Sequence, residues 1–336
     1  MESKIKIILI FRKKRDNCTS IENVFDNIHE NLNNDFQLVR YELVGSVLKD
    51  VKNLLEMKGD IYHITGDVNY IAILLFWKNI ILTVHDFGHI NSLKYVKKLV
   101  YKFIWFDLPI RIANKITFVS EKTLKDCVTY YGTKKKYNVI NNAFSNALIS
   151  PGNKIEDSGR CDILQVGTKS YKNHKKVIDI LSLVKDKGSF RLIIIGTLDD
   201  DDKEKLKGHS INFKNFVDLD FEDVVEIYKK SDIVTVLSSG EGFGMPVIEA
   251  NASANALIIS NIEPLISIAN GSALIADTNK LLYISQQIEE LISNHNLRNE
   301  FKAKGIANAE NYRPEFIAGE YKKVYLELYE ENFIRK

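Results

Sequence analysis

The stretch SSGEGFGMPVIEA (residues 238–250) follows the apolar run 233–237 and combines two glutamates, Glu241 and Glu249, with three glycines. The β-branched run predicts a buried strand, and Pro246 is suited to the first turn of a helix, where no backbone N–H donor is required. Exposed amides at a helix start bind phosphate or sugar oxygens, and carboxylates accept hydrogen bonds from hydroxyls. The stretch therefore predicts a strand, loop and helix that bind a hydroxyl-rich phosphate ester. Taken alone, it is equally compatible with solvent-facing acids that complement the helix dipole.

The composition predicts a soluble globular protein of two domains. The chain has 336 residues, of which 45% are hydrophobic and 27% charged, and domains average about 150 residues. A formal charge of +2 argues against nucleic acid as the main partner. The distant cysteines Cys18, Cys127 and Cys161 predict free thiols in a reducing compartment. The apolar runs are too short for a membrane-spanning helix, which needs about 20 residues.

Short apolar runs alternate with helical patterns along the chain, which is typical of βαβ units and parallel sheets. The predicted strands are 6–11, 61–64, 80–84, 116–119, 163–166, 192–195, 233–237 and 256–259, with helices at 21–32, 122–131, 174–185 and 221–230. Pro and Gly among polar residues at 147–160 predict a linker between two doubly wound domains. The four aspartates at 199–202 are interpreted as an exposed acidic loop that precedes a helix starting at Lys203.

A resemblance rests on several separated segments that occur in one order. EGFGMPVIEA resembles the Glu-x7-Glu signature of the retaining GT-B glycosyltransferases of family four, also called glycosyl transferases group 1. Further segments similar to that family are TVHDFG (83–88), ITFVSEKTLKD (116–126), ILQVGTKSYKNHKKVID (163–179), the segment 213–239 and GIANAENYRPEFIAGEYKKVYLELY (305–329). The resemblance therefore covers nearly the whole chain.

The resemblance implies an α/β GT-B fold, in which two Rossmann-like doubly wound domains face each other across a cleft. Residues 1–150 would form the acceptor-side domain, 151–312 the nucleotide-sugar-binding domain, and 313–336 a terminal helix that packs back on the first domain. The implied activity is retaining transfer of a hexose from a UDP- or GDP-linked donor to a hydroxyl of a lipid-linked or surface-glycan precursor. No metal ion or other cofactor is expected.

The resemblance also implies roles for individual residues. His85, Glu241 and Lys172 would serve catalysis, and Lys172 would contact the donor phosphates. Glu249 would bind the nucleotide ribose. Further donor contacts would come from Gly167, Thr168, Gly242, Phe243, Gly244 and Met245. Arg12 and Asp86 are candidates for phosphate or acceptor contacts, although a solvated basic turn explains Arg12 equally well, and His85 is also compatible with a strand-end histidine whose hydrogen bonds are satisfied.

Thr168 departs from the family, which commonly has an arginine directly after the phosphate-loop glycine. Lys169 and Lys175 are candidates to supply the missing charge. The departure keeps a catalytically weak sugar-nucleotide-binding protein open as an alternative, beside a transferase that acts on a soluble small molecule or protein. An epimerase or phosphorylase with a similar two-domain cleft is a further alternative.

A basic region predicts a membrane contact. Residues 91–136 carry a net charge of +8, and a helix is expected at 93–106, ended by Pro109. At about 100° per residue, Lys94, Lys97, Lys98 and Lys102 share an arc with Tyr101 and Trp105, opposite Leu93, Val96, Leu99, Val100 and Phe103. If the lysine arc faces outward, it suits an anionic membrane surface on the cytoplasmic side, with Lys94, Lys98, Lys102 and Trp105 in contact. A solvated basic face is the alternative.

Overall fold

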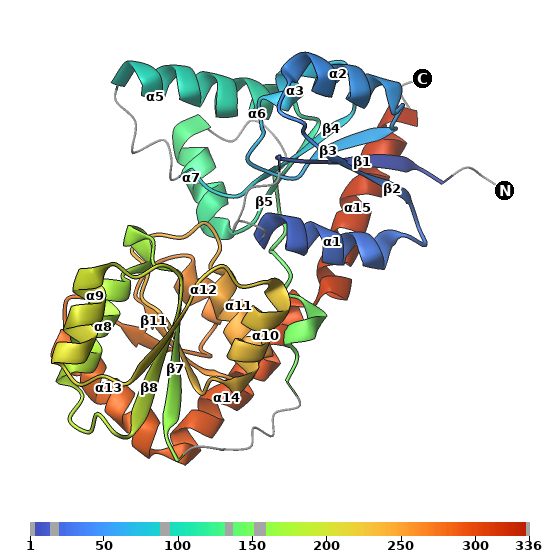
Figure 1. The fold of residues 1–336 in the computed structure, drawn as a ribbon. Helices are drawn as coiled ribbons and strands as arrows, with labels where there is room; N and C mark the ends of the chain where they lie inside the picture. The colour runs from blue at the N-terminus through green and yellow to red at the C-terminus, as the bar shows by residue number, and fades with distance from the viewer. Residues whose placement is uncertain (1–3, 14–19, 88–94, 132–136, 151–158, 334–336) are drawn as a thin grey trace. The chain divides into compact units, whose positions relative to one another are not determined.

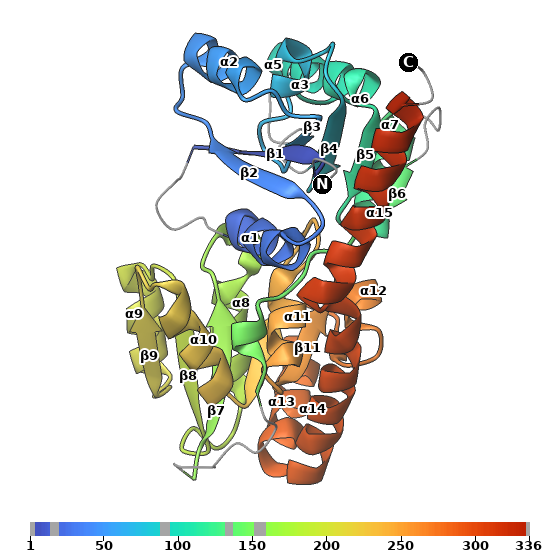
Figure 2. The same ribbon diagram turned by 90° about the vertical axis from the view of Figure 1, so that its right-hand side faces the viewer.

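The computed structural model describes residues 4–13, 20–87, 95–131, 137–150 and 159–333, and the chain divides into two units. One unit contains residues 1–143 and 313–336, and the other contains residues 144–312. Each holds a six-stranded parallel sheet with helices on both faces (Figures 1 and 2). The predicted α/β class with two doubly wound sheets is confirmed. The second unit begins at Phe144 and not at residue 151.

The first sheet has the order β2-β1-β3-β4-β5-β6, so the strand order reverses between β1 and β3. Its inner strands are mostly apolar, because both faces are covered by helices. The strands are β1 (Lys6–Phe11), β2 (Gln37–Glu42), β3 (Ile61–Ile64), β4 (Ile80–Val84), β5 (Lys115–Phe118) and β6 (Tyr137–Val139). The helices are α1 (Ser20–Leu32), α2 (Val47–Glu56), α3 (Ile71–Leu74), α5 (Tyr95–Lys102), the π-helix η1 (Phe103–Asp107), α6 (Leu108–Ile112), α7 (Glu121–Tyr131) and α15 (Pro314–Phe333).

The second sheet has the order β12-β11-β10-β7-β8-β9. Counted from β7, this is the 3-2-1-4-5-6 order of dinucleotide-binding sheets. The strands are β7 (Cys161–Val166), β8 (Phe190–Ile195), β9 (Phe213–Phe216), β10 (Ile233–Val236), β11 (Ala256–Ser260) and β12 (Leu274–Ala276). The helices are η2 (Asn146–Leu148), η3 (Ser170–Lys172), α8 (His174–Leu183), α9 (Asp200–Gly208), α10 (Phe221–Lys230), α11 (Met245–Ala252), α12 (Leu265–Ala269), α13 (Leu281–Ser293), α14 (His295–Ala309) and η4 (Glu310–Tyr312).

Two predicted helix boundaries are wrong. The aspartates at 199–202 do not form a loop: Asp199 caps α9 by accepting the backbone N–H of Asp202, and the next three aspartates form the first turn. Acids stabilise this end of a helix because its amides are unpaired. Pro109 does not end the preceding helix either, because η1 connects α5 to α6 and Pro109 lies in the first turn of α6, where the missing N–H costs no hydrogen bond.

The terminal helix α15 is joined to the first sheet by buried polar side chains. His63 Nδ1 lies 2.8 Å from the Tyr325 hydroxyl, and His63 Nε2 lies 2.8 Å from Thr83 Oγ1. Lys115 adds an ion pair to Glu331 at 2.8 Å. Burial, reinforced by nearby His85, lowers the pKa of His63 to about 3, so the imidazole is neutral in the folded protein at neutral pH.

The buried His63 predicts that acid weakens the fold. Its folded-state pKa lies below the unfolded value of about 6.5, so the unfolded chain binds the extra proton and the free energy of unfolding falls as pH drops. We expect His63 to contribute about 2 kcal/mol of this loss between pH 6.5 and 5. Urea unfolding of the wild type and His63→Gln at both pH values measures it. Equal pH dependence in the two proteins would contradict the assignment.

Candidate functional site

The predicted ligand site of the second unit lies where the strand order reverses, between β7 and β10. Ligands of doubly wound sheets bind at this point, outside the carboxyl ends of the strands. Two loops leave these strands, residues 167–173 and 237–244, and hydrogen bonds join them. Asn173 Nδ2 donates to the Leu237 carbonyl at 2.7 Å, and the Ser239 N–H donates to the Tyr171 carbonyl at 2.8 Å. The two loops therefore form one site.

Lys172 and Glu241 meet within this site. Lys172 Nζ lies 2.7 Å from Glu241 Oε1, and both side chains are largely buried. Ser238 Oγ donates to the same carboxylate oxygen at 2.7 Å. An ammonium has three donors, so Lys172 can keep its bond to Glu241 while its other N–H groups face an anion.

Gln165 supports the phosphate loop and was not predicted. Its Nε2 donates to the Gly167 carbonyl at 3.1 Å, and its Oε1 accepts from Thr235 Oγ1 at 2.9 Å. Because the end of β7 is buried and otherwise apolar, this amide side chain must find hydrogen-bond partners within the protein. This single polar residue in the run ILQV was the available signal.

Glu249 projects from the second turn of α11 and binds a tyrosine that the sequence did not single out. The Tyr228 hydroxyl, from α10, donates to Glu249 Oε2 at 2.8 Å. Burial raises the pKa of Glu249, although the Tyr228 hydrogen bond and the charge of Lys172 oppose the shift. Burial, together with the Glu249 charge, raises the pKa of Tyr228 well above its usual value. Tyr228 therefore stays a donor and orients the carboxylate.

The loop before α11 requires glycine at position 244. Gly244 is the N-cap residue with φ +100°, and a Cβ there would lie 2.6 Å from Leu265 Cδ2. Pro246 lies in the first turn and Met245 is the first helical residue. Phe243 is buried and contacts Tyr312 edge-on, with ring centroids 6.0 Å apart. The predicted strand, loop and helix are present.

Thr168 lies beside Gly196: a Cβ placed on that glycine would come within 2.7 Å of Thr168 Oγ1. The proposed substitutes for the family's arginine differ in their contacts. Lys175 pairs with Asp199 at 2.8 Å and Asp202 at 3.5 Å, so its charge is already compensated. Lys169 is exposed.

In the first unit, His85 follows β4. Its Nε2 lies 2.7 Å from the Thr65 carbonyl, and because a carbonyl only accepts, Nε2 carries the proton. Burial lowers the pKa of His85, and the neutral ring has its lone pair on Nδ1. Gly66, at φ +142°, makes room for the ring, since a Cβ there would lie 2.4 Å from His85 Cδ2.

Arg12 follows β1, and its guanidinium lies between two carboxylates. Arg12 Nε donates to Glu22 Oε1 at 2.9 Å, and Nη1 approaches Asp67 Oδ2 at 3.5 Å. The side chain is largely buried, so the interpretation as a solvated basic turn is wrong for Arg12. Asp86 is exposed at the end of β4.

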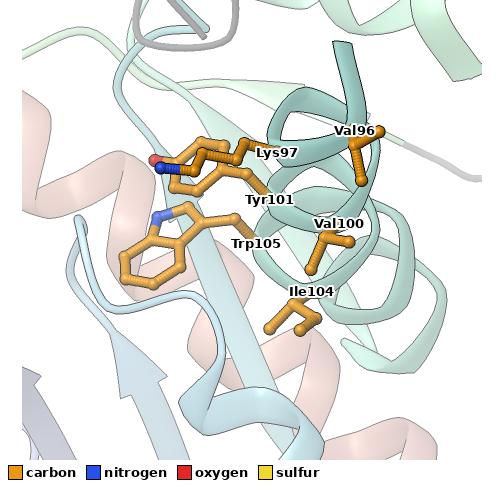
Figure 3. Close-up of a pocket in the computed structure, with 6 residues that line it drawn as sticks. All are labelled: Val96, Lys97, Val100, Tyr101, Ile104 and Trp105. Carbon is orange, nitrogen blue, oxygen red and sulfur yellow. The ribbon is translucent and has the colours of Figure 1, made fainter. Parts of the chain in front are cut away.

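The predicted orientation of the basic helix is wrong. Tyr101 and Trp105 face the core, with ring centroids 5.2 Å apart, and Trp105 contacts Tyr70 at 5.1 Å. Lys102 Nζ lies 4.9 Å from the ring centroid of Tyr131 in α7. Lys98 is half-buried, and Lys94 lies outside the described residues. The outward face consists instead of Val96, Leu99, Val100 and Phe103, which were expected opposite the lysines, together with Ile104. Figure 3 shows Val96, Val100 and Ile104 on this face.

None of the helices in the described part of the chain is both long enough and apolar enough to span a membrane. Within the same residues, no three His, Cys, Asp or Glu side chains are grouped so that they could hold a metal ion. Cys127 and Cys161 are buried free thiols, and Cys18 lies outside the described residues.

Known proteins resemble this chain in sequence and in fold. Residues 151–308 match the family described as "Glycosyl transferases group 1". The N,N'-diacetylbacillosaminyl-diphospho-undecaprenol alpha-1,3-N-acetylgalactosaminyltransferase of Campylobacter jejuni is 28% identical over 161 residues, which cover 46% of this chain and 41% of that protein. The amylovoran biosynthesis glycosyltransferase AmsD of Erwinia amylovora is 24% identical over 221 residues, covering 61% and 60%. The chain thus aligns with about half the length of these relatives.

A solved structure matches over almost the entire chain. Anabaena Alr3699/HepE, in complex with UDP and glucose, superposes with a TM-score of 0.79 at 13% identity, covering 96% of this chain and 100% of that one. The fold is therefore that of the GT-B proteins, the two-domain α/β class in which each domain is doubly wound. The match to Glycosyl transferases group 1 spans residues 151–308, slightly less than half of the chain, and lies within the second unit.

Proposed function

We propose that the protein transfers a sugar from a nucleotide-diphosphate sugar to an acceptor hydroxyl. The observation that carries this proposal is the Lys172–Glu241 pair at the strand reversal of the second sheet. Lys172 can stabilise the diphosphate that leaves the donor, because a positioned cation favours the charge that develops there. Glu241 can accept hydrogen bonds from the sugar hydroxyls. Glu249 is oriented by Tyr228, and its other carboxylate oxygen can accept a hydrogen bond from a ribose hydroxyl.

We propose a UDP- or GDP-linked sugar as the donor and retention of the anomeric configuration. The Anabaena structure contains UDP and glucose, which favours a UDP-linked sugar over a GDP-linked sugar as the donor. We propose that the anomeric configuration is retained, with the acceptor attacking on the face that the diphosphate leaves. Catalysis then consists of positioning the reactants and of stabilising the departing diphosphate, and we propose that the reaction needs no metal ion. His85 would act on the transferred sugar from the first unit.

The acceptor is proposed to be a lipid-linked or surface-glycan precursor. The Campylobacter relative is named for a diphospho-undecaprenol acceptor and the Erwinia relative for amylovoran biosynthesis. We propose that the protein works on such a precursor at the cytoplasmic face of a membrane, as a peripheral protein. A transferase that acts on a soluble acceptor is the second candidate.

Labelled sugar nucleotides test the proposal. The protein is incubated with UDP- or GDP-sugars and a polyprenyl-diphosphate acceptor, with and without EDTA, and both the released nucleotide and the shift in unfolding temperature are measured. We expect one nucleotide class to raise the unfolding temperature, because a ligand that binds only the folded state stabilises it, and its sugar nucleotide to be consumed at a rate that EDTA does not change. Binding without consumption in the presence of a polyprenyl-diphosphate acceptor would favour the non-catalytic alternative.

A further inference from the structure

The outer face of α5 and η1 exposes a row of apolar side chains. Val96 is 71% exposed, Val100 54% and Phe103 50%. With Leu99 and Ile104, these residues repeat at intervals of three and four positions, which places them on one side of a helix. Figure 3 shows Val96, Val100 and Ile104 in line along the helix. They border a shallow groove of about 420 Å³ lined by Val96, Lys97, Val100, Tyr101, Ile104 and Trp105.

These side chains point outward because aromatic side chains already occupy the inner face of the same helix. Tyr101 and Trp105 stack there, and Phe106 contacts Phe87 with ring centroids 4.6 Å apart. Contiguous apolar patches are uncommon on monomeric proteins and mark contact sites. The five residues Val96, Leu99, Val100, Phe103 and Ile104 are called the α5 apolar face below.

The charge around the α5 apolar face identifies its partner. α5 has three lysines and no acid, and the exposed Lys97 lines the groove. Two copies of the chain that paired these faces would bring lysines together, which is unfavourable. Apolar side chains beside basic ones match a bilayer whose headgroups are anionic and whose interior is hydrocarbon.

We propose that the α5 apolar face inserts into the interface of an anionic lipid bilayer, with Lys97 at the headgroup level. The inference deepens the membrane location proposed above by naming the contact residues. It differs from an electrostatic lysine stripe because the apolar side chains, and not only the cations, hold the protein. Part of the binding therefore survives at high salt, since screening weakens only the electrostatic contribution.

Vesicle co-sedimentation, without donor or acceptor, tests the inference independently of transfer activity. The probes are phosphatidylcholine vesicles with and without phosphatidylglycerol. The variant Val100→Asp/Phe103→Asp removes apolar contacts, and its matched control is Leu282→Asp/Phe316→Asp, two exposed residues elsewhere in the chain at 61% and 57%. We expect phosphatidylglycerol vesicles to bind the wild type and the control equally, and the α5 variant about 10-fold or more weakly. Lys97→Gln should weaken binding at low salt and change little at high salt.

Four results would overturn the inference. The wild type could ignore phosphatidylglycerol vesicles at low salt, or the α5 variant could bind as well as its control. The α5 variant could unfold at a markedly lower temperature than the control without lipid, which would show that another part of the chain covers the face. Sedimentation equilibrium could reveal a wild-type oligomer that the α5 variant loses, which would assign the face to a protein contact.

Discussion

The Lys172→Ala variant should turn over roughly 100- to 1000-fold more slowly than the wild type, the range seen when one group that stabilises developing charge is removed. Lys172 carries the cation nearest to Glu241, at 2.7 Å, while Lys175 is paired with Asp199 and Asp202 and Thr168 contributes no charge. Lys172 should therefore stabilise most of the leaving diphosphate. Steady-state release of nucleotide measures the effect, and circular dichroism checks that the variant is folded.

Removal of Lys172 also leaves the Glu241 carboxylate without its ion-pair partner, and this second effect must be separated from the first. The double variant Lys172→Ala/Glu241→Gln does so, because it removes both charges. If the lysine acts on the diphosphate, the double variant should remain as slow as Lys172→Ala. Recovery of turnover in the double variant would show that Lys172 only neutralises Glu241. Lys169→Ala tests the remaining candidate for the missing charge, and Thr168→Arg tests whether an added cation raises turnover.

The Glu249→Ala variant should bind the nucleotide about 10- to 150-fold more weakly, since a hydrogen bond to a charged group contributes about 1.5–3 kcal/mol. The carboxylate lies in α11 and is oriented by the Tyr228 hydroxyl at 2.8 Å, which leaves its other oxygen for a ribose hydroxyl. Titration calorimetry with UDP and GDP measures the loss. Unchanged affinity in a folded variant would remove Glu249 from the site.

Tyr228 gives this prediction a second measurement that distinguishes orientation from direct contact. Tyr228→Phe keeps the ring and removes the hydroxyl, so it should weaken nucleotide binding less than Glu249→Ala does. It should also raise the pKa of Glu249 further, because the lost hydrogen bond favoured the charged carboxylate. Protonation removes an acceptor, so nucleotide affinity should fall on acidification at a higher pH in Tyr228→Phe than in the wild type. Glu226→Ala, on the exposed side of α10, is the control.

The strands that the sequence predicted are the inner strands of both sheets, and the four that it did not are their edges. β1, β3, β4, β5, β7, β8, β10 and β11 were expected, whereas β2, β6, β9 and β12 end the two sheets. An inner strand is covered on both faces and is therefore mostly apolar. Most residues of β2 are exposed or half-buried. Its sequence, QLVRYE, mixes polar and apolar residues, and such a mixture does not distinguish a strand from a loop.

The site was predictable only in part. The loop glycines and the two glutamates stand close together in the sequence, because a strand, a turn and a helix place them there. Tyr228 comes from α10, and only the tertiary structure brings it to Glu249. Gln165 lies just before the phosphate loop, but only the pairing of β7 with β10 gives it the second partner Thr235. Tyr228 lies 21 positions from Glu249, and no local pattern marks that contact. Gln165 lies two positions from Gly167, and its only signal in the sequence is a polar residue in an apolar run. The folded chain alone assigns these two residues to the site.

The sequence by itself determined that residues near 96–105 form an amphipathic helix with lysines on one arc and apolar residues on the other. Helical periodicity fixes which side chains share a face, because it depends only on about 100° of rotation per residue. It does not decide which face turns inward. That choice depends on what the rest of the unit offers, and here Tyr70, Phe87 and Tyr131 provide aromatic partners for Trp105, Phe106 and Lys102. The tertiary structure therefore turned the aromatic arc to the core and left Val96, Val100 and Phe103 exposed.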